Sequence, residues 1–218
     1  MVTKKEQEFV QHLLKWFENN KRNFAWRNPE LSPFNVLIAE IMLQKTGANQ
    51  VEPLFTTFIQ DYPTAESVAN LTEEDLGEIL KPLGLFKRRA RDIKKAVNAI
   101  IDNGGQIPKD PKELMALPGV GEYIANAVSC FAFGQRTAIV DANVGRIIKR
   151  VFSFPVKSAP SRDKALTEKM NEIVPEQDYR AFNLALLDFA ALTCLPRTPS
   201  CEGCPLIKMC DFYNNQEL

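Results

Sequence analysis

Leu117 to Asp141 reads LPGVGEYIANAVSCFAFGQRTAIVD, and this stretch indicates the fold of the whole chain. Its opening, Leu-Pro-Gly-Val-Gly, predicts a turn, because glycine adopts backbone conformations that other residues rarely take. The apolar run that follows predicts a helix. A helix that begins after such a turn presents N–H groups without helical acceptors at the positive end of its dipole. These groups bind a phosphate without needing a cationic side chain.

The same stretch resembles the helix-hairpin-helix, and the Gly/Pro-rich loop ending in an aspartate, of the endonuclease III superfamily of DNA glycosylases. The resemblance extends from Phe24-Ala25-Trp26-Arg27 to Cys210. It implies double-stranded DNA with a mismatched or damaged base as the partner, with Asp141 facing the sugar of a base flipped out of the duplex. The residues that it assigns to DNA binding are Gln44, Gly119, Val120, Gly121, Asn143 and Arg197.

Length and composition indicate a globular protein with one good core or two smaller ones, since 45% of its 218 residues are hydrophobic. No apolar run approaches the ~20 residues that span a bilayer. The N-terminus, MVTKKEQEFV, lacks the apolar core of a signal peptide. We therefore expect an intracellular, monomeric protein of the cytoplasm or nucleoid that has no membrane partner.

Most of the chain has the apolar periodicity of helices, which predicts an all-α fold. The first helix carries Val10, Leu13, Leu14, Trp16 and Phe17 and ends near Asn19-Asn20. Further helices are expected after the hairpin and over 34–46, 51–61, 64–69, 73–80, 88–103, 111–115, 142–152, 162–173 and 179–193.

The resemblance also implies how these helices are distributed between two domains. Residues 30–142 would form a six-helix domain that contains the hairpin. Residues 1–29 and 143–218 would form a second helical domain that includes a cysteine loop, 194–210. The DNA and its flipped base would lie in the cleft between the two domains.

Net charge gives no evidence for a nucleic-acid partner, because 27 Lys and Arg residues balance 27 Asp and Glu residues. Local charge is more informative. Each basic side chain that reaches a phosphate adds salt-sensitive affinity, although a solvated helix face is the alternative. Between 81 and 95 the only acidic residue is Asp92, and the basic residues are Lys81, Lys87, Arg88, Arg89, Arg91, Lys94 and Lys95. Three more basic residues follow Asp141, namely Arg146, Lys149 and Arg150.

Four cysteines, Cys194, Cys201, Cys204 and Cys210, have the spacing C-x6-C-x2-C-x5-C. Four thiols in one short loop of an intracellular protein favour a metal site over disulfides. Structural zinc is the alternative, but it usually pairs two close half-sites across a longer gap. The spacing matches the 4Fe-4S loop of the endonuclease III family, which implies a cluster that holds Arg197 and Lys208 towards DNA.

Asp141 is the first catalytic candidate. A carboxylate in a partly dry site stabilises the positive charge that develops on the sugar when an N-glycosidic bond breaks. The alternative is that Asp141 only caps the helix that begins after it. The match to the family's loop aspartate favours the catalytic interpretation.

Glu40 is the second catalytic candidate, because it is a charge within the apolar run Leu37 to Leu43. Burial raises the pKa of a carboxyl group, as a proton donor to a leaving base requires, whereas exposure on the polar side of the helix is the alternative. The run Glu-Ile-Met-Leu-Gln-Lys-Thr resembles the adenine and thymine-mismatch branches of the family, where this glutamate lines the base pocket. Gln44 matches the position that fills the gap left by the extruded base; an ordinary surface glutamine is the alternative.

Tyr123 is the third catalytic candidate. It occupies the position where bifunctional family members carry a Schiff-base lysine. A phenol cannot form that adduct, so we expect a monofunctional hydrolase without strand cleavage, with Tyr123 packed near the sugar. Asn143 completes the Asp-x-Asn pattern of the monofunctional branches and is expected to place a phosphate or water. Asp188, alone in an apolar helix, is interpreted as a structural hydrogen-bonding residue.

Thymine or uracil opposite guanine is the expected target. Adenine enzymes of the family usually carry Gly-Leu-Gly-Tyr-Tyr where this chain has Pro82-Leu83-Gly84-Leu85-Phe86, and a further domain beyond the cysteine loop. Adenine opposite guanine or 8-oxoguanine is the alternative target. A DNA-binding module without catalysis is a second alternative, against which the presence of both Glu40 and Asp141 argues.

Overall fold

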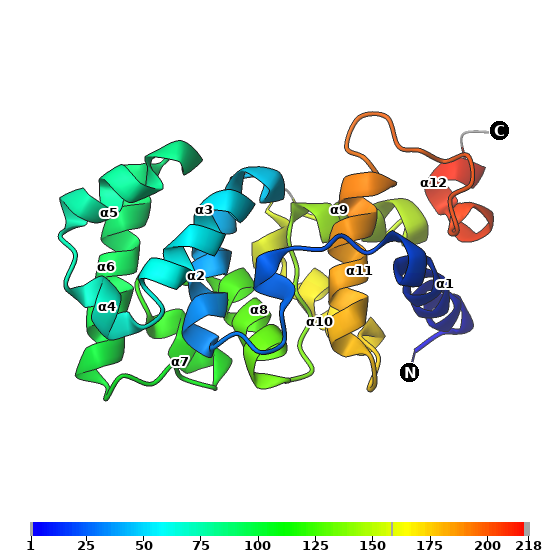
Figure 1. Ribbon diagram of the computed structural model, residues 1–218. Coiled ribbons are helices and arrows are strands. Elements are labelled where there is room, and N and C mark those ends of the chain that lie inside the picture. Colours follow the sequence, from blue (N-terminus) through cyan, green and yellow to red (C-terminus); the bar gives the residue numbers. More distant parts are fainter. Residues whose placement is uncertain (1, 158, 216–218) are drawn as a thin grey trace. The chain divides into compact units, whose positions relative to one another are not determined.

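The computed structural model describes residues 2–157 and 159–215 (Figure 1). These residues form helices and loops without a β-strand, which confirms the all-α prediction. The chain divides into two compact units: a middle unit, Asn23–Gln135, and a terminal unit that joins Met1–Arg22 with Arg136–Leu218. No helix in the described part of the chain is long and apolar enough to span a membrane.

The middle unit contains α2 to α8. Helices α2 to α7 begin and end within three residues of the bounds expected from the sequence, and those of α5 agree at both ends. Local capping explains this agreement at α5, where the Thr72 hydroxyl accepts the N–H of Asp75 and the Asp75 carboxylate accepts the N–H of Thr72. The elements are η1 (Ala25–Arg27), α2 (Pro33–Leu43), α3 (Ala48–Asp61), α4 (Ala65–Ala69), α5 (Glu73–Leu80), η2 (Lys81–Leu83), α6 (Phe86–Asp102), α7 (Pro111–Ala116) and α8 (Glu122–Phe133).

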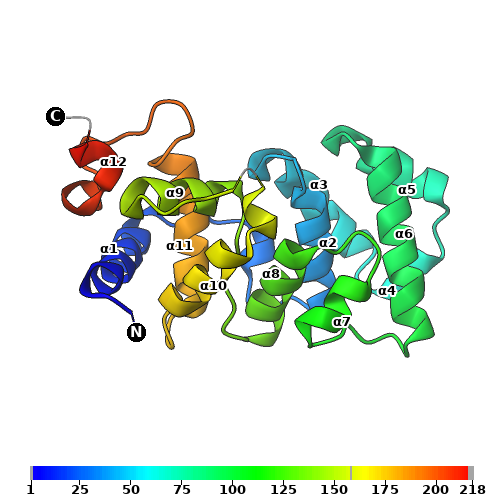
Figure 2. The ribbon, with the colours of Figure 1, turned by 180° about the vertical axis from the view of Figure 1, so that it is seen from behind.

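Helix α2 forms the centre of the middle unit. Every residue from Phe34 to Met42 is buried, and the helix packs against α3, α6 and α8. Ser32 caps the helix through the N–H of Asn35, and Pro33 at its first position supplies a backbone angle suited to a helix start. Figure 2 shows α7 and α8 side by side, joined by the short turn that contains the Leu-Pro-Gly-Val-Gly sequence.

The terminal unit has its own apolar core. The ring of Phe9 lies edge-on against those of Phe152 and Phe182, which joins the first helix to two helices from the other end of the chain. Its elements are α1 (Lys4–Asn20), α9 (Ala142–Phe152), η3 (Pro160–Arg162), α10 (Lys164–Ile173), α11 (Tyr179–Leu192), η4 (Ile207–Met209) and α12 (Asp211–Asn214).

Asp188 anchors the end of the α1 segment to α11. Its carboxylate is fully buried and accepts the backbone N–H of Arg22 at 2.9 Å and the Arg22 Nε at 2.6 Å. Because a buried carboxylate needs such donors, this pairing confirms the structural, hydrogen-bonding role predicted for Asp188.

Candidate active site

The hairpin between α7 and α8 is a tight turn closed by its own backbone. The N–H of Val120 donates to the carbonyl of Leu117 at 3.1 Å, and Gly119 has a φ of +79°. A Cβ built on Gly119 would lie 2.8 Å from the Cβ of Asp92 in α6. Glycine is therefore required at 119 both by backbone conformation and by the close approach of α6.

Gln44 lies next to this turn. It is the residue that ends α2, and its side-chain Nε2 donates to the carbonyl of Gly119 at 3.1 Å. The end of α2 and the hairpin, which are far apart in sequence, are thus joined by a direct hydrogen bond. Two residues assigned to DNA binding from the sequence therefore lie together in the middle unit.

Arg89 has a different role from the one expected for the basic run. Its side chain is buried, at 4% exposure, so it is not available to a DNA phosphate. Burial lowers the pKa of its guanidinium group. The guanidinium donates instead to protein oxygens in the last turn of α2 and in the segments that follow α2 and α5. These are the carbonyls of Ile41, Gln44, Leu83 and Gly84 and the hydroxyl of Thr46.

The helical periodicity of α6 indicates that Arg89 is buried, which the count of basic residues does not. Arg89 lies one turn before Ile93, on the buried stripe that continues through Ala96 and Ile100. Lys94 is also engaged by the fold, because its amine donates to the carbonyls of Ala69 and Leu71. The exposed remainder of the run that can meet solvent or DNA is Lys81, Lys87, Arg88, Arg91 and Lys95.

Glu40 and Tyr123 belong to two helices of the middle unit that pack against each other, α2 and α8. Glu40 is 4% exposed, which excludes the alternative that it lies on the polar side of its helix. Tyr123 is half-buried at the second position of α8 and packs against the core of the same unit. Glu40 is thus shielded from bulk water, and Tyr123 is shielded in part.

Leu85 is an exposed apolar residue that follows Gly84 on the same loop. Its side chain is 59% exposed, the most among the large hydrophobic residues described, and its φ is +50°. A leucine in the left-handed region is uncommon and persists where surrounding bonds fix the loop. Here the hydrogen bonds from Arg89 to Leu83 and Gly84 fix it.

Asp141 lies in the terminal unit, immediately before α9. Its Oδ1 accepts the N–H groups of Asn143 and Val144, both at 2.8 Å, so Asp141 caps α9. Its Oδ2 accepts the side-chain Nδ2 of Asn143 at 2.7 Å. The carboxylate is half-buried and held at both oxygens, and capping leaves its negative charge available to a substrate.

Asn143 is in turn held by Arg146. The Arg146 Nη1 donates to Oδ1 of Asn143 at 2.9 Å, while its Nε and Nη2 donate to the carbonyls of Cys194 and Ala190 at 3.0 and 3.1 Å. A chain of hydrogen bonds therefore runs from the end of α11, where the cysteine loop begins, to the carboxylate of Asp141. The sequence marked Arg146 only as a basic residue.

The cysteine loop is held to α9 by Arg150. Its guanidinium donates to the Cys194 sulfur at 3.3 Å and to the carbonyls of Leu195 and Pro196 at 2.7 and 2.8 Å. Arg197, the next residue in the loop, is exposed, as is Lys208. Both basic residues are thus presented to solvent by a loop that α9 fixes.

The four cysteines are free thiols whose charges affect one another. Burial raises the pKa of the Cys204 thiol to about 11, and the neighbouring Cys210, Cys194 and Cys201 add to the effect. Backbone N–H groups also donate to these sulfurs, from Leu206 to Cys204 and from Phe212 and Tyr213 to Cys210. Across 2–157 and 159–215, no three His, Cys, Asp or Glu side chains are placed as a ready metal site.

A family model described as the HhH-GPD superfamily base excision DNA repair protein matches residues 38–176. The thymine/uracil-DNA glycosylase of Methanothermobacter thermautotrophicus is 37% identical over 97% of this chain and 96% of its own length. The adenine DNA glycosylase of Mycobacterium tuberculosis is 34% identical over 89% of this chain, which spans only 64% of that relative.

A solved structure of a thermostable thymine-DNA glycosylase has a similar fold. It superposes with a TM-score of 0.92 at 37% identity and covers 97% of this chain and 98% of its own. The similarity therefore extends over both units of the chain.

Proposed function

Because the chain belongs to the HhH-GPD superfamily of base excision DNA repair proteins, we propose that it is a monofunctional DNA glycosylase that releases thymine or uracil mispaired with guanine. The relative from Methanothermobacter supports this choice of base, since the identity of 37% extends over nearly the whole of both chains. A mismatched base is easier to extrude than a paired one, which adds selectivity without further contacts.

The observation that carries this proposal is the fixed carboxylate of Asp141, bonded to Asn143 at both oxygens. When the N-glycosidic bond breaks, positive charge develops on the deoxyribose. A carboxylate that is already oriented stabilises this charge without reorganisation and directs a water to the sugar carbon. We assign Asp141 this role.

Glu40 is assigned as the proton donor to the departing base. Its side chain is nearly enclosed by α2 and its neighbours. A carboxyl group shielded from bulk water passes its proton to the base rather than to solvent, which makes the base a better leaving group. In this proposal Glu40 acts on the base and Asp141 acts on the sugar.

Tyr123 supports hydrolysis without strand cleavage. A lyase step begins with attack of an amine on the sugar, and a phenol at this position supplies no amine. We propose that the half-buried ring packs against the sugar and limits the access of water, while the reaction ends at an abasic site.

The DNA backbone is proposed to meet the hairpin. Since the N–H of Val120 is bonded within the turn, the donors for a phosphate are the N–H groups at the start of α8, with Gly119 and Gly121 allowing close approach of the strand. Gln44, held at Gly119, is assigned to the gap left by the flipped base. Arg197 completes the proposed contacts.

We propose that the cysteine loop holds a 4Fe-4S cluster. Cys194, Cys201, Cys204 and Cys210 would hold it, and the N–H and guanidinium donors directed at three of their sulfurs are those that stabilise thiolate ligands. Four thiolates brought together by one short loop would need a compensating metal charge. When bound, the cluster would supply rigidity to the loop that carries Arg197 and, through Arg146, to the Asn143 that orients Asp141.

The decisive experiment compares duplexes with T:G, U:G, T:A, A:G and A opposite 8-oxoguanine under single-turnover conditions, with abasic sites scored by alkali. We expect release of T and U opposite G and little action on T:A. Release of adenine alone would reassign the substrate, and release of no base would leave a DNA-binding module.

Borohydride trapping tests the monofunctional assignment. Wild-type protein should give little or no covalent adduct with DNA, whereas Tyr123→Lys should gain some because an amine is then placed at the start of α8. Tyr123→Phe is the matched control, since it removes the hydroxyl without adding an amine. Efficient trapping by the wild type would show that another lysine acts as a nucleophile.

A further inference from the structure

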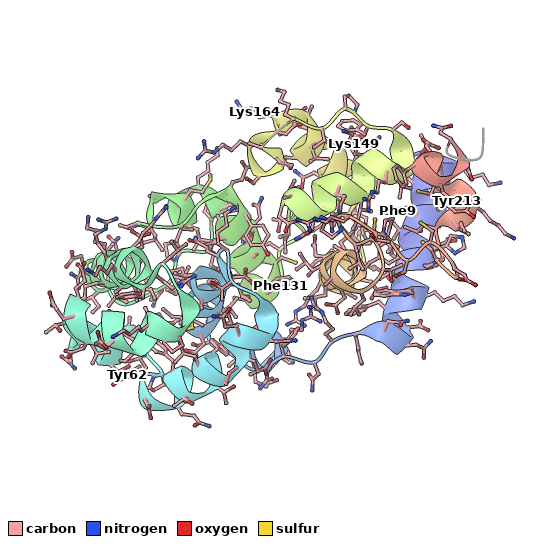
Figure 3. The ribbon with its side chains drawn as sticks, turned by 90° about the horizontal axis from the view of Figure 1, so that it is seen from above. Phe9, Tyr62, Phe131, Lys149, Lys164 and Tyr213 are labelled. Carbon is pink, nitrogen blue, oxygen red and sulfur yellow. The ribbon has the colours of Figure 1, made fainter. Side chains whose placement is uncertain are left out.

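A cavity of about 750 Å³ lies along one side of α9 in the terminal unit. Arg146, Lys149, Arg150 and Lys157 line it, and none of the described lining residues is acidic. Several cations around one hollow create a positive potential that attracts an anionic group. Figure 3 shows Lys149 projecting from α9 at the surface of this unit.

The wall opposite α9 is fixed by close packing. Ser153 ends α9 with a φ of +51°, which turns the chain back across the helix. The returning loop crosses α9 at Gly145, where an added Cβ would lie 2.8 Å from the Cβ of Pro160 and 3.2 Å from the Cγ1 of Val156. The cavity is therefore a built feature that depends on glycine at this position.

Two of the four cations are held in place and two are free to adjust. Carbonyls of the cysteine loop and of α11 fix the guanidinium groups of Arg146 and Arg150. Lys149 and Lys157 are exposed, with flexible amines. The nearby acid, Asp163, is 1% exposed and accepts the backbone N–H groups of Lys157 and Leu166. Its charge is thus largely satisfied by the backbone.

We propose that this cavity binds a phosphate group of the DNA backbone, together with part of the attached sugar. The cavity is larger than one phosphate, and Val156, Pro160 and Phe212 supply apolar walls beside the cations. Ala142, another lining residue, directly follows Asp141, so the cavity and the assigned catalytic carboxylate share the start of one helix. The inference rests on the proposed function for its ligand, and a free phosphate or nucleotide shares the same chemistry.

The test is the salt dependence of binding to an undamaged duplex, which requires no excision. Lys149 and Lys157 are the residues to change, because Arg146 and Arg150 also hold the cysteine loop. The double variant Lys149→Ala/Lys157→Ala should bind about tenfold more weakly, and the slope of log K against log salt should fall by about one to two. The matched control is Lys15→Ala/Lys164→Ala, which removes two exposed lysines of the same unit outside the cavity (Lys164 is labelled in Figure 3).

An equal slope for the cavity variant and the wild type would overturn the proposal, as would an equal reduction in both double variants. A titration with pyrophosphate, monitored by thermal melting, distinguishes a DNA phosphate from a free phosphate ligand. Stabilisation of wild type but not of the cavity variant, with unchanged DNA binding, would assign the cavity to a small phosphate ligand and overturn the DNA assignment. If the wild type excises no base but the slopes differ as expected, the proposed function fails and the phosphate site stands.

Discussion

Asn143 Nδ2 donates a hydrogen bond of 2.7 Å to Asp141 Oδ2, while the backbone N–H of the same asparagine donates to Asp141 Oδ1 at 2.8 Å. One residue therefore contacts both oxygens of the carboxylate. Rotation of the carboxylate would break these two bonds and the bond from the Val144 N–H to Oδ1. The bonds that begin α9 also orient the group that we assign to catalysis. Capping and catalysis are compatible roles of Asp141, because the cap uses N–H donors and leaves the negative charge in place.

Asp141→Asn should separate these two roles. The amide oxygen can still cap α9, so the fold should be retained, but the charge that stabilises the sugar is lost. Excision should fall by about a thousandfold or more, while binding to undamaged duplex stays equal or improves because a negative charge is removed. Single-turnover excision and duplex titration measure the two effects. The control is Asp178→Asn, which makes the same change at an exposed residue before α11. Near-normal excision by Asp141→Asn would mean that Asp141 only caps the helix.

Asn143→Ala tests the orientation of the carboxylate. Two side-chain bonds are lost, from Asn143 Nδ2 to Asp141 Oδ2 and from Arg146 Nη1 to Asn143 Oδ1, whereas the bond from the backbone N–H to Asp141 Oδ1 remains. We expect the excision rate at saturating protein to fall about 10- to 100-fold, with a smaller change in the affinity for substrate DNA. An effect on affinity alone would instead indicate that Asn143 contacts a phosphate, as the sequence suggested. The matched control is Asn19→Ala, because Asn19 is exposed at the end of α1. Asn171→Ala is unsuitable, because the Asn171 side chain accepts the N–H of Ala138.

Metal analysis tests the cysteine loop. Anaerobically purified protein should contain about four irons per chain and absorb broadly in the visible range. Cys201→Ala should lose most of the iron because a ligand is removed. Cys130→Ala should keep it, since Cys130 is buried in α8 of the other unit. Stoichiometric zinc without iron in the wild type would assign the loop to a zinc site.

Arg89→Met tests the buried guanidinium. The substitution leaves the carbonyls of Ile41, Gln44 and Gly84 without this donor, and we expect the free energy of unfolding to fall by about 3 kcal/mol. Arg88→Met changes the neighbouring side chain, which is 71% exposed, and should cost less than about 1 kcal/mol. Denaturant unfolding measures both. Equal costs would mean that the hydrogen bonds of Arg89 contribute nothing specific.

Glu6→Gln tests a pH dependence in the terminal unit. Burial raises the pKa of Glu6, but hydrogen bonds from Lys169 and Thr3 outweigh it and hold the pKa below its ordinary value of 4.5. A lowered pKa means that the carboxylate stabilises the fold above pH 4.5 and that this contribution is lost as the pH falls below 4.5. Glu6→Gln should therefore cost about 1–2 kcal/mol near neutral pH and progressively less in acid.

Unfolding at several pH values measures this difference. Glu8→Gln, whose surface pair with Lys4 spans 3.7 Å, should show little change at any pH. A cost for Glu6→Gln that is the same in acid and at neutral pH would contradict the assignment to the ionised carboxylate.

The elements that depend on neighbours in the chain could be predicted from the sequence. The all-α class and the bounds of α5 followed from apolar periodicity and from the Thr72 cap. The turn at Gly119 followed from its glycines, and the helix start after Asp141 from the preference of aspartate for that position. These features are local, because each needs only residues within a few positions of one another.

Contacts between polar groups that are far apart in the chain could not be predicted from the sequence, because they depend on how the helices pack. Arg89 belongs to a run of basic residues in the sequence. It donates to the carbonyls of Gln44 and Gly84 because α6 directs its side chain towards the loops after α2 and α5. The bond from Gln44 to Gly119 and the bonds from Arg146 to Asn143 and Cys194 are likewise set by packing. A buried donor must find an acceptor wherever the fold places one, and sequence spacing does not encode that position.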